Sequence, residues 1–185
     1  MQRSPALRDR IATGILDAAT AVFSIRGDAT SMGDVATAAG VSRATLYRYF
    51  PTREELVRAL RASALRNARA RLDQADLNSV PVPDALARLT RALVTTGAHY
   101  TVVLHEQGPA DRADAARLLG EPIRSVFRRG VDDGSLRADR DPERLTALYA
   151  GLIGAAIQMT ADGLGVEDAC DEVVAVVLDG VRARP

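Results

Sequence analysis

Apolar residues recur at intervals of three and four along nearly the whole chain, which is the spacing of one face of an α-helix. The clearest stripe is formed by Ile11, Ile15, Ala19, Val22 and Phe23. The β-branched run at 173–178 also suits a strand, but its acidic neighbours and its helical spacing favour a helix. The pattern therefore predicts an all-α protein of about nine helices, with no strand.

Capping and turn residues divide this pattern into separate helices. Ser31 with Asp34 three residues later predicts the start of a short helix over 31–39, which Gly40 ends, and Ser42 caps the next helix to about residue 49. Asp84 is expected to cap a helix after the linker at 78–83, and Pro122 and Pro142 are expected in the first turns of two others. Further helices are expected at 53–76, at 113–119, from 122 to about 131, from 142 to about 162 and at 166–181.

The charge of the chain is distributed unevenly along its length. The 185 residues carry 24 basic and 24 acidic side chains, and every basic one is arginine. Residues 1–71 hold 12 Arg and 6 acidic residues, whereas residues 72–185 hold 12 Arg and 18 acidic residues. A basic front and an acidic back indicate a polyanion-binding region followed by a region with a different task.

Several classes of protein are disfavoured by what the chain contains. A single cysteine, Cys170, excludes a disulfide framework and a cysteine zinc cluster, and His99 and His105 are spaced poorly for sharing a metal from one helix. The longest uncharged apolar stretch, 148–157, is about half of a membrane span. No hydrolase, metalloprotease, phosphate-loop or dinucleotide motif is present. We therefore expect a cytoplasmic protein that is not an enzyme and has no metal, cofactor or membrane partner.

The most informative block surrounds Gly40, a residue that can adopt the positive φ of a tight turn. Ala36 stands four residues before it, where two helix backbones come close, and Leu46 stands six residues after it, where it can fill the corner. This spacing is typical of a helix-turn-helix, whose second helix enters the major groove of DNA. The alternative that spacing leaves open is a small helical core with a solvated basic helix, as in an adaptor that binds protein and not DNA.

If the block binds DNA, the outward residues of its second helix are the ones that contact it. Arginine reads guanine bidentately, threonine contacts a thymine methyl group, and tyrosine hydroxyls suit phosphates. Residues at neighbouring helix N-termini can present backbone N–H groups to phosphate. The predicted DNA contacts are Thr30, Ser31, Ser42, Arg43, Ala44, Thr45, Tyr47, Arg48, Tyr49, Thr52 and Arg53.

Residues 29–36 (ATSMGDVA) and 39–50 (AGVSRATLYRYF) strongly resemble the TetR family of bacterial transcription regulators. The segments 15–19 (ILDAA) and 53–56 (REEL) extend the likeness, which covers about residues 8–60. The resemblance implies a DNA-binding domain over 1–52 and a helical ligand-binding and dimerisation domain over 53–185. It further implies a homodimer that binds a palindromic double-stranded DNA operator and is released from it by a small-molecule effector. Family habit favours repression of transcription.

Two positions depart from the family pattern. Gly33 stands where the family often has a basic or polar residue, which weakens the short helix and removes a backbone contact. Arg53 replaces the usual lysine and should still engage phosphate. By position, Arg43, Thr45 and Tyr49 correspond to base-reading residues of the family, and Ser31, Tyr47 and Arg53 to phosphate-contacting ones.

The last two helices are predicted to form the dimer interface, because their apolar residues cover more than one face. Two DNA half-sites also require two copies of the helix-turn-helix. The alternative is that they complete the core of the domain itself, and Cys170 is best read as a small buried apolar residue. The expected interface residues are Leu148, Leu152, Ala155, Ala156, Met159, Cys170, Val173, Val177 and Val181. The effector pocket that the family implies is expected to involve Thr96, His99, Tyr100, His105, Phe127, Tyr149, Gln158 and Met159.

Overall fold

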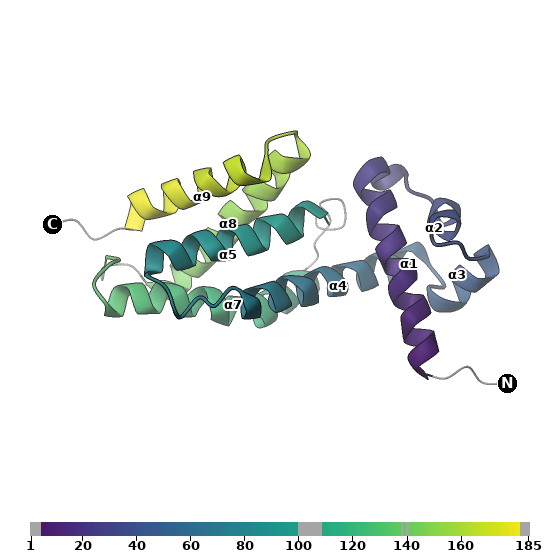
Figure 1. The fold of residues 1–185 in the computed structure, drawn as a ribbon, viewed down its shortest axis with the longest axis horizontal. Helices are drawn as coiled ribbons and strands as arrows, with labels where there is room; N and C mark the ends of the chain where they lie inside the picture. Colours follow the sequence, from purple (N-terminus) through teal and green to yellow (C-terminus); the bar gives the residue numbers. More distant parts are fainter. Residues whose placement is uncertain (1–4, 100–108, 138, 140, 182–185) are drawn as a thin grey trace. The chain divides into compact units, whose positions relative to one another are not determined.

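Helices account for almost all of the chain that the computed structural model describes, which comprises residues 5–99, 109–137, 139 and 141–181. Within these residues the predicted all-α class is confirmed, with eight α-helices and one short 3-10 helix (Figure 1). Their bounds are α1 (Pro5–Arg26), η1 (Gly27–Ala29), α2 (Met32–Ala38), α3 (Arg43–Tyr49), α4 (Arg53–Gln74), α5 (Val82–His99), α7 (Pro109–Asp132), α8 (Pro142–Ala161) and α9 (Val166–Val181).

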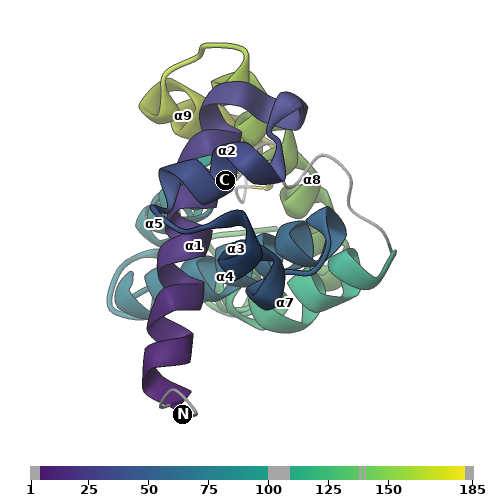
Figure 2. The same ribbon diagram turned by 90° about the vertical axis from the view of Figure 1, so that its right-hand side faces the viewer.

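The described residues up to Ala64 form a first compact unit, built by α1, α2, α3 and the first part of α4. In this unit α2 and α3 lie on the same side of α1 (Figures 1 and 2). Leu56 and Leu60 of α4 are completely buried in its core, so the structural unit extends beyond the expected boundary at residue 52. The rest of that core consists of Ile15, Ala19, Phe23, Val35, Ala36, Leu46 and Phe50.

The second unit holds Leu65–Ala98 and the described residues from Pro109 onward. Its core collects the inward faces of the later part of α4 and of α5, α7, α8 and α9. Helices α8 and α9 pack against each other and are joined by a turn in which Gly163 has a φ of +105° (Figure 1). None of the described helices combines the length and the apolar character that crossing a membrane requires.

Helix α7 corrects the prediction of two separate helices at 113–119 and 122–131. It is continuous, and Pro122 lies inside it. Proline has no N–H to donate to the carbonyl of Leu118, four residues earlier. The Arg69 side chain supplies a substitute donor, because its Nη1 lies 3.3 Å from the Leu118 oxygen. This contact comes from α4 and could not be read from the spacing of α7.

Helix α5 also begins earlier than predicted. Asp84 was expected to cap the helix, but it lies within the first turn, and the Ala85 N–H already donates to the Pro81 carbonyl at 2.9 Å. Pro83 is compatible with this start because the first N–H groups of a helix have no partner within it. The predicted end of this helix near residues 108–109 falls largely outside the described residues.

Candidate nucleic-acid interface

The turn between α2 and α3 has the geometry that the sequence predicts. Gly40 has a φ of +63°, in the left-handed region that favours glycine. The Val41 N–H donates to the Ala36 carbonyl at 3.0 Å, which closes the turn over the end of α2. Ala36 and Leu46 are buried at this corner. The pair α2–α3 is therefore a helix-turn-helix.

Helix α3 starts at a side-chain cap. The Ser42 hydroxyl oxygen accepts a hydrogen bond from the Thr45 N–H at 3.1 Å and also donates to the Thr45 Oγ1 at 2.9 Å. These two contacts connect the first turn of α3 to the residue that precedes it. The Ser42 and Thr45 side chains are thus joined by a hydrogen bond at the start of α3.

One face of α3 is buried and the other is open to solvent. Leu46 is completely buried, whereas Tyr47 exposes 45% of its surface although it is aromatic. Arg48 is exposed, and its guanidinium lies 5.5 Å from the centre of the half-buried Tyr49 ring. An exposed edge that carries arginine and tyrosine provides donors for both base edges and phosphates. The other exposed predicted contacts on this helix and at its cap are Ser42, Arg43 and Ala44.

The start of α2 is held by a reciprocal capping box. The Asp34 N–H donates to Ser31 Oγ at 3.1 Å, and the Ser31 N–H donates to Asp34 Oδ2 at 3.0 Å. The Ser31 hydroxyl also donates to Asp34 Oδ2 at 2.7 Å, and Arg26 Nη1 lies 2.6 Å from Asp34 Oδ1. The hydrogen bonds from Ser31, followed by the charge of Arg26, hold the pKa of Asp34 below its usual value. The capping box follows from the sequence, whereas the Arg26 contact does not, because a partner eight residues away leaves no local spacing signal.

Two of the predicted DNA contacts, Thr30 and Arg53, are not fully exposed. Thr30 is only 3% exposed, and its hydroxyl donates to the Val22 carbonyl at 3.4 Å, so its side chain is packed inside the first unit. Arg53 is half-buried, with its guanidinium 5.3 Å from the centre of the Phe23 ring. Thr52 is exposed, and its hydroxyl accepts the Glu55 N–H at 3.1 Å at the start of α4.

Known proteins share both this sequence pattern and this fold. Residues 15–60 match the sequence model described as bacterial regulatory proteins, tetR family. LfrR of Mycolicibacterium smegmatis, an HTH-type transcriptional repressor, is 29% identical over 181 residues, which cover 96% of this chain and 94% of LfrR. KstR2 of Rhodococcus jostii, also named a repressor, is 27% identical over 92% of this chain and 91% of its own. The crystal structure of LfrR from Mycobacterium smegmatis in complex with proflavine gives a TM-score of 0.77 at 27% identity, over 95% of this chain and 99% of that one.

This chain is similar to TetR-family regulators over nearly its whole length. Its function is that of a DNA-binding transcriptional regulator, and it is not an enzyme. The exposed edge of α3 is the part of the helix-turn-helix that faces solvent in this regulator.

Three of the residues expected to line an effector pocket, Phe127, Tyr149 and Thr96, are buried. Phe127 and Tyr149 meet edge to face with their ring centres 5.6 Å apart, but both are 1% exposed and belong to the core of the second unit. The Tyr149 hydroxyl lies 2.7 Å from Thr90 Oγ1, and burial raises the pKa of Tyr149. Thr96 is buried and donates to the Ala92 carbonyl.

The remaining members of that predicted set lie nearer the surface or cannot be placed. Gln158 is half-buried and donates to Asp162 Oδ1 at 3.1 Å, and Met159 is 40% exposed. His99 ends α5, and Tyr100 and His105 lie outside the described residues.

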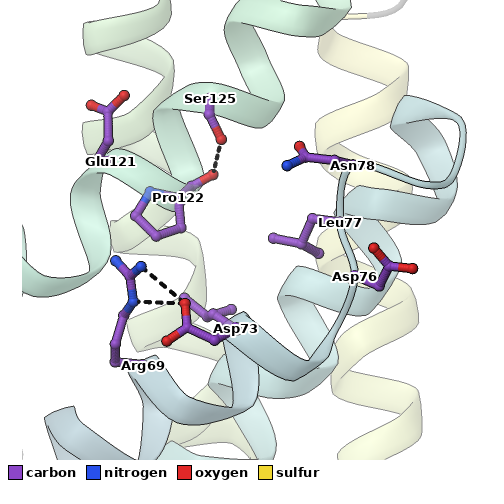
Figure 3. A pocket seen from close by; sticks show the side chains of 9 residues that line it. Arg69, Asp73, Asp76, Leu77, Asn78, Glu121, Pro122 and Ser125 are labelled. Carbon is purple, nitrogen blue, oxygen red and sulfur yellow. Dashed lines mark hydrogen bonds and ion pairs between the residues drawn. The ribbon is translucent and has the colours of Figure 1, made fainter.

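A groove of about 340 Å³ opens elsewhere in the second unit, between the end of α4 and the middle of α7 (Figure 3). It is bordered by the Arg69–Asp73 ion pair, whose Nε–Oδ1 distance is 2.9 Å, and by the backbone around Pro122. None of its residues was predicted from the sequence to line a pocket. The lining consists of Arg69, Leu72, Asp73, Asp76, Leu77, Asn78, Glu121, Pro122 and Ser125.

The expected dimer residues divide into an inner and an outer set. The stripe of α9 is buried within the chain's own second core, as the alternative reading of the sequence held, and Ala156 of α8 lies there too. The buried members are Ala156, Cys170, Val173, Val177 and Val181. The outer members are on α8, where Leu148 is 69% exposed, Leu152 is half-buried, and Ala155 and Met159 are exposed. Val176 of α9, which was not predicted, is also 55% exposed.

Proposed function

We propose that this regulator binds a palindromic operator as a homodimer, represses transcription there, and is released by a small-molecule effector. The observation that carries the proposal is the solvent-exposed edge of α3, which follows a closed helix turn and carries Arg43, Tyr47 and Arg48. A helix of this kind reads one half-site, so a palindrome requires two copies of the chain. Since chromosomal DNA is the target, we place the protein in the bacterial cytoplasm.

The outer face of α8 supports the homodimer. Between Arg144 and Asp162 the helix has no charged residue. Its exposed positions there are small or apolar, and the sites above Gly151 and Gly154 are open, so a second helix can approach closely. An exposed uncharged face of this kind marks an association surface. The members of the face are Ala147, Leu148, Ala150, Gly151, Gly154, Ala155 and Met159.

The effector proposal rests on the similarity to LfrR and on the path of α4, which contributes to both cores. The solved structure of the relative LfrR is a complex with proflavine, which supports an organic effector for this chain as well. We place that effector in the second unit. Helix α4 contributes Leu56 and Leu60 to the first core and Ala68 and Leu72 to the second. A shift of this continuous helix upon effector binding would displace the helix-turn-helix as well.

Selection of bound sequences from a random DNA pool tests the proposal. We expect two inverted half-sites whose centres lie about 34–36 Å apart, the length of one helical turn. Affinity for the selected duplex should fall steeply with salt, with a log–log slope of about −0.9 for each neutralised phosphate. A flat salt response and no enriched sequence would instead favour a helical adaptor that binds protein.

Two arginine variants distinguish base recognition from phosphate contact on the selected operator. Arg43→Ala should reduce base preference at one position of each half-site by about 1–3 kcal/mol, because that is the discrimination a bidentate contact provides. Arg53→Ala should weaken operator and random DNA alike. Equal losses on both kinds of DNA for Arg43→Ala would refute its reading role.

A further inference from the structure

The guanidinium of Arg43 does not extend freely from α3 but lies against α2 at Gly33. A Cβ atom added to Gly33 would stand 2.7 Å from Arg43 Nη2, 3.2 Å from its Cζ and 3.3 Å from its Nε. Real Cβ atoms essentially never lie within 3.0 Å of another heavy atom to which they are not bonded. Any residue other than glycine at position 33 would therefore displace the head of Arg43.

Nothing in the backbone of α2 requires glycine at this position. Gly33 is inside the helix, and it is absent from the glycines with positive φ, which are Gly27, Gly40, Gly134 and Gly163. Glycine is also the least favourable residue in a helix interior apart from proline. What uses the missing Cβ is the Arg43 side chain, which has no hydrogen bond or ion pair with any residue that the structure describes.

We propose that Gly33 is the positioning residue for Arg43, and so sets how strongly the protein discriminates the base pair that Arg43 contacts. This inference rests on the proposed DNA-binding function. In a helix-turn-helix the first helix crosses the DNA backbone while the second lies in the groove. A guanidinium on the first residue of α3 that lies against α2 would stand at the edge of the groove. Bidentate reading needs that planar group in one orientation.

The test compares four variants on the operator selected from the random pool and on a set of operators substituted one base pair at a time. The variants are Gly33→Ala, Arg43→Ala, the double variant, and Gly14→Ala. Gly14 is the matched control, because it is also a helical glycine of the first unit but has no atom within 4 Å of its Cβ position. Alanine favours a helix at both sites, so melting curves will show that all glycine variants fold.

Gly33→Ala should reduce discrimination at one base-pair position of each half-site by about fivefold or more, at the same position that Arg43→Ala affects. The double variant should match Arg43→Ala within about twofold, since Gly33 acts only through Arg43. Gly14→Ala should retain the wild-type profile. In the DNA-free protein the NMR resonance of the Arg43 Nε–H group should shift in Gly33→Ala and stay in place in Gly14→Ala.

Unchanged base preference in Gly33→Ala, or effects of the two single variants that add in the double variant, would overturn the positioning role while leaving DNA binding intact. A uniform loss on all sequences would overturn it as well, because that is the result of a purely structural defect. Failure of the wild type to bind any duplex would overturn the proposed function and this role together.

Discussion

Truncating Leu148 to alanine should weaken the homodimer without unfolding the chain. The Leu148 side chain is 69% exposed in the single chain, so most of its surface makes no contact that stabilises the monomer fold. Full burial of a leucine contributes about 1.5–3 kcal/mol, and burial of the exposed two-thirds against a partner contributes about 1–2 kcal/mol. A twofold interface contains the residue twice, which gives about 2–4 kcal/mol. The dimer dissociation constant should therefore rise by a factor of about 30 to 1,000.

Sedimentation velocity over a dilution series measures this change directly. The matched control is Ile25→Ala, since Ile25 is an apolar residue that is 84% exposed but lies on α1 of the first unit. The control should sediment like the wild type at every concentration, and operator affinity should fall in Leu148→Ala alone. If Leu148→Ala dimerises as tightly as the wild type, the outer face of α8 is not the interface and the reasoning from its exposed surface is refuted.

Two further predictions concern the stability of the fold, measured by urea denaturation at one protein concentration because association contributes to it. Tyr149→Phe should lower the free energy of unfolding by about 1 kcal/mol, since the Thr90 hydroxyl keeps its hydrogen bond to the Leu86 carbonyl. Thr90→Val should lower it by about 1–3 kcal/mol, because the buried Tyr149 hydroxyl then loses its partner. Equal losses in the two variants would contradict this asymmetry. For Asp34, whose pKa is lowered in the folded state, the stabilisation is present above the unfolded pKa of about 3.9 and is lost as pH falls through the lower folded value. The stability difference between wild type and Asp34→Asn should therefore shrink below about pH 4, and a difference that stays constant with pH would rule out the carboxylate as its source.

Local signals predicted the all-α class and the helix-turn-helix. Gly40, Ser31 and Ser42 act within five residues of themselves, so their roles as turn and caps follow from spacing alone. The apolar stripe of α9 also follows from spacing, because every fourth or third residue faces the same core. What spacing could not decide is which surface that stripe meets, and it proved to be the chain's own core.

Contacts between elements distant in the sequence account for what was missed. Pro122 is a common helix start, and it lies inside α7 where Arg69 of another helix donates to the carbonyl that proline leaves without a partner. Gly33 looked like a weak point of α2 until the position of Arg43 was known. Each of these depends on a side chain from a different helix, which no local pattern records.

The central claim is that the exposed edge of α3 reads operator bases in the major groove. The most direct measurement is the affinity for the selected operator after single guanines are replaced, in turn, by 7-deazaguanine, which removes a major-groove acceptor, or by inosine, which removes a minor-groove donor. We predict that 7-deazaguanine weakens binding at one or more positions of each half-site and that inosine leaves it unchanged there. Loss of affinity with inosine alone would contradict the claim.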